Sequence, residues 1–254
     1  MRYEAIAESD KGIVKETNQD SVLIKHGMYK EREILMAIVC DGMGGLSSGE
    51  IASATVVKKF ADWFDNELPR ELEKLDMSVI GGKWELLLKN LNRYIGEYGI
   101  KNGERLGTTF TGVLFVDGEY VAAHVGDSRL YYIDSDINQL TEDQTFIARE
   151  IKKGTMTLEQ ARTDKRRNML LQCVGASEVV EPEIFNGKTQ KGIYMICSDG
   201  FRHEISEKEI LENLKPAKLK NKDKMKSAAR YLIDLNMKRQ EKDNISVLII
   251  KTVE

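Results

Sequence analysis

The first forty residues carry the apolar patterns of β-strands. Arg2–Ser9 alternates between apolar and polar positions, Ser21–His26 is short and apolar, and Ile34–Cys40 is continuously apolar. An uninterrupted apolar run of that length is typical of a strand buried on both faces. Asp117-Gly118 separates two further apolar runs, which predicts a hairpin. The later predicted strands are Thr108–Val116, Glu119–Val125, Arg129–Asp134, Val180–Phe185, Gly192–Cys197 and Ile245–Lys251.

Helical spacing of apolar residues appears in two parts of the chain. After a glycine-rich turn, Ser47 or Ser48 is expected to cap a helix. A second helix is predicted over Lys83–Tyr98, and a capping box at Ser206–Glu209 opens a short one before a longer helix over about Asp223–Gln240. The apolar faces of the first two helices are Ile51, Ala52, Val56, Phe60 and Phe64, and then Leu87, Leu88, Leu91 and Ile95.

Residues 141–180 differ from the rest because they are polar and basic. A capping box at Thr157–Gln160 predicts a small helical insertion over the sheet edge. Its basic residues are Arg149, Lys152, Lys153, Arg162, Lys165, Arg166 and Arg167. Helices grouped between runs of strands predict an α+β layered domain with antiparallel sheets, rather than a doubly wound parallel fold. Without repeats or linkers, residues 1–254 are expected to form one domain.

Composition narrows the function classes. The 254 residues include 38 Lys+Arg and 41 Asp+Glu, for a net charge of −3. No apolar run approaches the ~18 residues of a membrane-spanning helix, and the N-terminus resembles neither a secretory signal nor a myristoylation site. We therefore expect a cytoplasmic protein without membrane or nucleic-acid partners. The lysines between positions 215 and 226 are interpreted as a solvated loop and helix start.

The cysteines, Cys40, Cys173 and Cys197, support no metal or nucleophile role. Their spacing does not suit zinc, and none has the Arg six residues later that a cysteine-dependent phosphatase needs. Cys40 and Cys197 are expected to be small buried residues within strands.

Five aspartates stand at predicted strand ends: Asp20, Asp41, Asp127, Asp199 and Asp243. An ionised carboxylate at the end of a buried strand is costly without a partner, and several together raise one another's pKa. A divalent cation would resolve the conflict, and all-oxygen ligation favours Mg²⁺ or Mn²⁺ over zinc. Taken singly, Asp-Gly at positions 41 and 199 is equally compatible with an ordinary turn.

The loop Gly42-Met-Gly-Gly-Leu-Ser-Ser suggests a competing hypothesis, a dinucleotide-binding turn. The fingerprint fails at its third glycine, where Ser47 stands, and the βαβ setting is missing. The chain has no P-loop motif either.

Taken together, these motifs resemble the metal-dependent serine/threonine protein phosphatases of the type-2C class, in their bacterial form. The resemblance covers almost the whole chain, with the motifs in family order. They are Gly12–Ser21, Val39–Gly45, Gly107–Thr111, His124–Tyr131, Leu140–Asp143, Arg167–Gly175, Cys197–Phe201 and Asp243–Val247.

The resemblance implies a four-layer α-β-β-α sandwich, in which two antiparallel sheets lie between helix pairs and residues 141–180 form a flap. It implies two Mn²⁺ or Mg²⁺ ions, bridged by Asp41, with the Gly42 carbonyl as a further ligand. The other implied ligands are Asp199 and Asp243, Asp20 through bound water, and, for a third and weaker ion, Asp127 with Asp199.

The implied activity is the dephosphorylation of phosphoserine and phosphothreonine proteins by metal-activated water. Asp41, Asp199 and Asp243 are the implied catalytic carboxylates. The expected partners are phosphoprotein substrates and an opposing bacterial serine/threonine kinase, and the expected state is a monomer. The alternatives are a weak or silent relative that binds phosphoproteins, and a nucleotide-binding regulator.

The chain departs from the family pattern at three positions. Lys15 stands where the family commonly has an Arg for the substrate phosphate; it is a candidate phosphate ligand without bidentate geometry, or simply a solvent-exposed residue. Met43 replaces the His of animal members, as in bacterial relatives. Gln144 follows Asp143 where a His is frequent.

Overall fold

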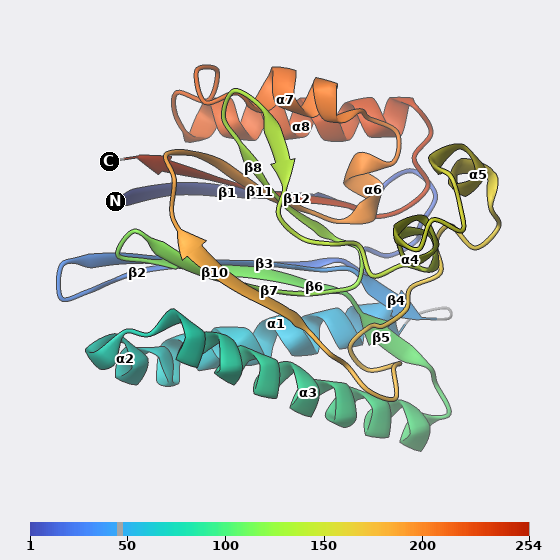
Figure 1. Ribbon diagram of the computed structural model, residues 1–254, viewed down its shortest axis with the longest axis horizontal. Coiled ribbons are helices and arrows are strands. Elements are labelled where there is room, and N and C mark those ends of the chain that lie inside the picture. Colours follow the sequence, from blue (N-terminus) through green and yellow to red (C-terminus); the bar gives the residue numbers. More distant parts are fainter. Residues whose placement is uncertain (45–47, 254) are drawn as a thin grey trace.

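The computed structural model describes residues 1–44 and 48–253, and across them the chain forms two five-stranded antiparallel sheets and a small third one (Figure 1). The large sheets have the strand orders β10-β7-β6-β3-β2 and β1-β12-β11-β8-β9, and β4 pairs with β5. The strands are β1 (Arg2–Asp10), β2 (Ser21–Tyr29), β3 (Arg32–Cys40), β4 (Gly42–Gly44), β5 (Leu106–Thr108), β6 (Phe110–Val116), β7 (Glu119–Val125), β8 (Arg129–Ile133), β9 (Ile137–Gln139), β10 (Glu183–Lys188), β11 (Gly192–Cys197) and β12 (Ile245–Val253).

Helices cover the two outer faces. Figure 1 shows α1 and α3 against the β2–β3 sheet and α7 and α8 against the β11–β12 sheet, which confirms the predicted four-layer sandwich. The helices are α1 (Gly49–Asn66), α2 (Leu68–Glu71), η1 (Leu72–Lys74), α3 (Met77–Asn102), α4 (Phe146–Lys152), α5 (Leu158–Thr163), α6 (Asp199–Arg202), α7 (Glu207–Leu214) and α8 (Lys222–Lys238). In the described part of the chain, no helix is both long and apolar enough to cross a membrane.

Strand β3 shows why its sequence is apolar without interruption. Its even-numbered residues, from Ile34 to Cys40, face α1 and α3. Its odd-numbered residues, from Leu35 to Val39, face the second sheet. Because successive side chains of a strand point to opposite faces, a strand between two cores must be apolar at every position.

Some predicted details are wrong. Ile51 is 39% exposed, and Trp63 is buried on the inner face of α1 instead. The hydroxyl of Ser48 donates to Glu104 and does not cap α1; Ser47 lies outside the described residues. Helix α3 starts six residues early, at Met77, where the Asp76 carboxylate accepts backbone hydrogen bonds as its cap.

The backbone after Asp41 also differs from the prediction. Gly42–Gly44 pairs with β5 as strand β4, where the sequence suggested a turn. Asp199 is the first residue of the short helix α6, which the sequence did not predict. Strand β10 starts at Glu183, three residues later than predicted.

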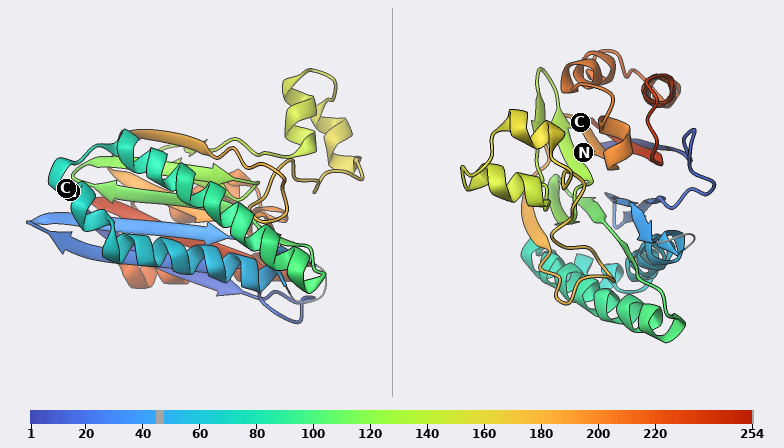
Figure 2. Two further views of the ribbon diagram at one scale, coloured as in Figure 1. Left: turned by 90° about the horizontal axis from the view of Figure 1, so that it is seen from below. Right: turned by 90° about the vertical axis from the view of Figure 1, so that its right-hand side faces the viewer.

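Residues 141–180 form the predicted helical insertion. They contain α4 and α5, and both hydrogen bonds of the Thr157–Gln160 capping box are present. Figure 2 shows the two helices projecting beyond the ends of the sheets. They stand at the same end of the molecule as β4 and α6, so the flap flanks that end (Figure 1).

Candidate metal centre

Antiparallel pairing brings four of the five aspartates to one end of the sandwich. Ser21 pairs with Cys40, so Asp20 before β2 and Asp41 after β3 lie side by side. Cys197 pairs with Val247, so Asp199 after β11 and Asp243 before β12 also come together. The fifth, Asp127, lies in the turn where the chain passes from β7 in one sheet to β8 in the other.

The backbone around Asp41 is fixed by two threonines. The Asp41 N–H donates to Thr109 Oγ1 (2.9 Å), and its carbonyl accepts from the Thr109 N–H (2.8 Å) and from Thr108 Oγ1 (2.9 Å). The next residue must be glycine, because a Cβ on Gly42 would lie 2.4 Å from two backbone carbonyl oxygens. The Gly107–Thr111 motif therefore holds the strand end from which Asp41 projects.

Asn244 connects the two pairs of aspartates. It is 3% exposed, and its Oδ1 accepts from the Gln19 N–H (2.9 Å). Its Nδ2 donates to the carbonyls of Lys11 and Thr17, both at 3.0 Å. One side chain at the start of β12 thus holds the loop that carries Lys15 and leads to Asp20. Asn244 is not among the predicted site residues; its only sequence signal is a polar side chain directly after Asp243.

Electrostatics show that the carboxylates are crowded. Burial raises the pKa of Asp20 to about 7, and the charges of Asp199 and Asp243 add to this rise. Burial also raises the pKa of Asp41 well above its usual value, followed by the charge of Asp20. The neighbouring carboxylate charges therefore disfavour ionisation of Asp20 and Asp41, and a divalent cation would remove this conflict.

Asp127 is held by residues of the flap base and of α6. The Gln144 side-chain oxygen accepts from the Gly126 N–H (2.8 Å), and the Gln144 backbone N–H donates to the Gly126 carbonyl (2.8 Å). Arg202 donates to the Asp127 carbonyl (3.0 Å) and lies 3.6 Å from its carboxylate. Burial and the charge of Asp199 raise the pKa of Asp127 to about 7, and Arg202 opposes this rise. Gln144 thus has a structural role where the family pattern differs.

Two basic side chains, Lys15 and His203, contact the aspartates of the β11–β12 sheet, Asp243 and Asp199. Lys15 Nζ lies 2.8 Å from Asp243 Oδ1. The Lys15 side chain is 40% exposed and the Asp243 side chain is 38% exposed. His203 Nε2 lies 3.5 Å from Asp199 Oδ2. Burial lowers the pKa of His203, but the contact with Glu241 and the charge of Asp199 outweigh it and leave the pKa above its usual value.

The arrangement fits a hydrated divalent ion. Both carboxylate oxygens of Asp20 and Oδ1 of Asp199 have no hydrogen-bond partner within the described residues. Across residues 1–44 and 48–253, no three His, Cys, Asp or Glu side chains close on a single point tightly enough to surround an ion. Mg²⁺ usually keeps several waters and takes only one or two carboxylates, so an open set of oxygen ligands is suitable.

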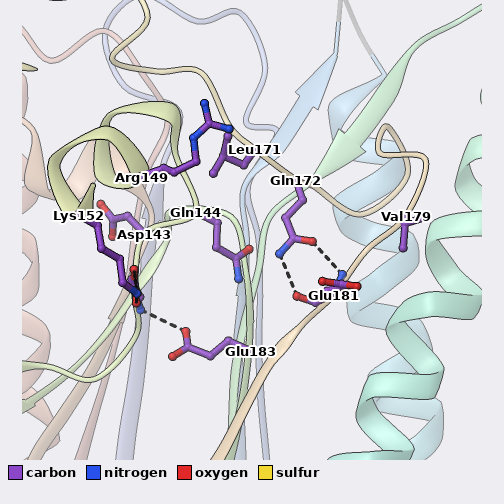
Figure 3. A pocket seen from close by; sticks show the side chains of 10 residues that line it. Asp143, Gln144, Arg149, Lys152, Leu171, Gln172, Val179, Glu181 and Glu183 are labelled. Atoms are coloured by element: carbon purple, nitrogen blue, oxygen red, sulfur yellow. Dashed lines mark hydrogen bonds and ion pairs between the residues drawn. The ribbon is translucent and has the colours of Figure 1, made fainter. Parts of the chain in front are cut away.

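One cavity in the described part of the chain has a lining that includes none of the five aspartates. It has a volume of about 760 Å³ between the flap and the segment that precedes β10. Figure 3 shows its polar lining, where the Gln172 side chain is paired with the Glu181 backbone and Lys152 lies among acidic residues. A second cavity, of about 520 Å³, lies under the flap helices and reaches Asp127, Arg202 and His203.

Comparisons with known proteins agree with this geometry. A family model described as protein phosphatase 2C matches residues 13–246. The serine/threonine protein phosphatase PstP of Mycobacterium tuberculosis is 31% identical over 257 residues, which cover 100% of this chain and 45% of that protein. This chain thus spans about half the length of the first curated relatives it matches.

Two solved structures are similar along the whole chain. The S. agalactiae serine/threonine phosphatase has a TM-score of 0.87 and 27% identity, over 99% of this chain and 100% of that one. The catalytic domain of PstP in complex with two manganese ions has a TM-score of 0.80 and 28% identity, over 99% of each chain. The chain belongs to the protein phosphatase 2C family.

Proposed function

We propose that this protein is a Mn²⁺- or Mg²⁺-dependent phosphatase that hydrolyses phosphoserine and phosphothreonine in proteins. One observation carries the proposal: buried carboxylate oxygens of Asp20 and Asp199 have no hydrogen-bond partner in the described part of the chain, and they lie at the end of the sandwich where the other strand-end aspartates meet. Family membership and the manganese-bound structure of a relative support the choice of metal and reaction.

In this proposal, residues from both sheets would hold two ions. Asp41 would bind both ions, and the Gly42 carbonyl would bind one of them. Asp199 and Asp243 would bind the other ion, and Asp20 would act through bound water. Asp127 and Asp199 would bind a third ion more weakly. When bound, the ions lower the pKa of water and neutralise the phosphoryl oxygens.

The protein's own groups then position the substrate. The Lys15 ammonium is at the exposed rim, and its contact with Asp243 uses one of three N–H donors. The others remain for a phosphoryl oxygen, as a point-charge contact. A thiol nucleophile is unsuited to this site, because burial raises the pKa of Cys40 well above its usual value and keeps it protonated.

Family membership supports the substrate class, because the curated relatives are named serine/threonine phosphatases. A phosphoseryl or phosphothreonyl protein is the product of a serine/threonine kinase, so we propose that the enzyme opposes such a kinase. The flap stands beside the site, and its basic residues suit an anionic phosphoprotein.

The test is release of phosphate from a phosphothreonine peptide, with Mn²⁺ and then with EDTA. We expect metal-dependent release that Asp199→Asn abolishes. Asp62→Asn is the matched control, because Asp62 is an exposed residue on α1, and it should leave the rate unchanged.

Absence of release would count against the proposal only if the protein is folded and binds Mn²⁺ in a spectroscopic titration. Peptide binding without hydrolysis would then point to the alternative, a catalytically silent phosphoprotein-binding protein. Failure to bind Mn²⁺ at all would contradict the metal centre itself.

A further inference from the structure

His203 and Glu241 form a bridge between two of the candidate ligands. His203 follows α6 directly, four residues after Asp199. Its imidazole has one nitrogen facing each of two carboxylates: Nε2 is 3.5 Å from Asp199 Oδ2 and Nδ1 is 3.5 Å from Glu241 Oε2. The ring therefore joins α6 to the segment between α8 and β12.

The other oxygen of Glu241 fixes the backbone that carries Asp243. Glu241 Oε1 accepts from the N–H groups of Lys242 (2.7 Å) and Asp243 (2.9 Å). Its own N–H donates to the Asn236 carbonyl (3.0 Å), so the residue is anchored to the end of α8. Glu241 is only 5% exposed. A buried carboxylate oxygen that accepts from two N–H groups of one turn stabilises the conformation of that turn.

The contact to Asp199 is selective between its two oxygens. His203 faces Oδ2, whereas Oδ1 has no hydrogen-bond partner in the described part of the chain. An orienting group on one oxygen that leaves the other available is the arrangement that outer-shell residues give to metal ligands.

The alternative is that His203 and Glu241 only hold helices α6 and α8 together, but another residue already does this. Asn236 already ties α8 to α6, because its Nδ2 donates to the Phe201 carbonyl (2.8 Å). The packing of these two helices therefore does not need His203. The additional effect of His203 and Glu241 is to orient the Asp199 carboxylate and to fix the backbone of Asp243.

We propose that His203 and Glu241 are positioning residues that hold Asp199 and Asp243 in one fixed arrangement for the metal. This inference rests on the proposed function, since it assumes that both aspartates bind the ion. It assigns a role to two residues that the sequence motifs leave unexplained.

The experiment measures Mn²⁺ affinity by spectroscopic titration of the full chain, for His203→Ala, Glu241→Ala and the double variant. Outer-shell substitutions typically weaken metal binding by about 10- to 100-fold, and we expect an effect in this range for each single variant. The double variant should lose far less than the product of the two effects, because both residues act through one bridge.

Conservative variants and a matched pair provide the controls. His203→Gln keeps one of the two contacts, and Glu241→Gln keeps an acceptor for the two N–H groups, so both should retain part of the affinity. His26 and Glu33 form a comparable pair at 2.6 Å in the middle of the β2–β3 hairpin. His26→Ala should leave Mn²⁺ affinity unchanged.

Thermal unfolding in EDTA shows whether each variant is folded, and the conservative variants carry the test if the alanine variants are not. Wild-type Mn²⁺ affinity in folded His203→Ala or His203→Gln would overturn the bridge and leave the proposed function intact. Absence of Mn²⁺ binding by the wild-type chain would overturn both. With phosphopeptide at saturating Mn²⁺, the variants should lower kcat and leave KM unchanged.

Discussion

The aspartate cluster has two halves, one from each large sheet, and they differ in whether basic side chains of the protein contact their carboxylates. Asp20 and Asp41, from the β2–β3 sheet, have no cationic side chain within ion-pair distance in the described ranges. Asp199 and Asp243, from the β11–β12 sheet, contact His203 and Lys15. In the proposed centre, charge neutralisation of the first half would therefore come from the bound cation, whereas Lys15 and His203 partly neutralise the second half. Substitutions in the two halves should have unequal effects.

The largest difference is expected in activity. Asp41→Asn should lower Mn²⁺-dependent kcat/KM by at least about 100-fold, because outer-shell losses alone reach that size and Asp41 is the proposed bridge. Asp243→Asn should cost less than Asp41→Asn but still at least about 10-fold, because Asp243 is a proposed ligand of one ion whereas Asp41 is proposed to bind both. Steady-state kinetics on a phosphopeptide, with Mn²⁺ titrated for each variant, measures both. Equal losses in the two variants would break the comparison.

The next effect concerns stability without metal. Asp20→Asn should raise the free energy of unfolding in EDTA at pH 8 by roughly 2–4 kcal/mol, because it removes a buried charge whose pKa is near 7 in the folded state. Asp199→Asn should give little gain, since it leaves His203 facing an amide. Urea unfolding measures both.

The pH dependence gives the sign of the Asp20 effect. Its pKa is raised on folding, so the contribution of Asp20 to the stability of the metal-free wild type is most favourable below the unfolded pKa and is lost as pH rises through about 7. The advantage of Asp20→Asn should therefore shrink on going from pH 8 to pH 5. An advantage that grows at pH 5 would show that burial of Asp20 is not its cause.

Asn244→Ala tests the link between the halves. It leaves the Gln19 N–H and the carbonyls of Lys11 and Thr17 without their partner. We expect a loss of about 1–3 kcal/mol in the free energy of unfolding. Mn²⁺ affinity should fall as well, because the loop before Asp20 is released. Asn138→Ala, in the exposed strand β9, is the control for a loss of amide groups.

The smallest effect is expected at Lys15. Its ion pair with Asp243 is exposed, so Lys15→Met should change stability by less than about 1 kcal/mol. KM for the phosphopeptide should rise a few-fold, and Lys15→Arg should lower it, because a guanidinium can bind phosphate with two parallel hydrogen bonds. An unchanged KM in both variants would show that Lys15 only pairs with Asp243 and does not bind the substrate phosphate.

The sequence predicted the parts of this structure that depend on local pattern. The uninterrupted apolar residues of strand β3 predict that both of its faces are buried, as the structure shows. The aspartates could be located because each stands next to such a strand or a turn. Their gathering at one end was suggested by the chemistry of unpaired charge, and the antiparallel register explains it.

The remaining parts depend on contacts between distant segments. His203 looked like an ordinary packed or surface histidine, and only the approach of Glu241, 38 positions later in the sequence, changes that interpretation. The early start of α3 was hidden by Gly81 and Gly82. A glycine is needed at position 81 because a Cβ there would lie only 2.7 Å from the Ile184 side chain in β10. Such crowding cannot be deduced from the helix sequence alone.

The pairing of β1 with β12 has a practical consequence for handling the protein. Arg2 lies opposite Val253, and both strands run from there toward the aspartates. Figure 1 shows the two chain ends together, at the far end from α6 and the flap. A tag, a fluorescent domain or a surface anchor attached at either end would therefore point away from the candidate metal centre. Immobilised protein should present that centre and the flap to the surrounding solution.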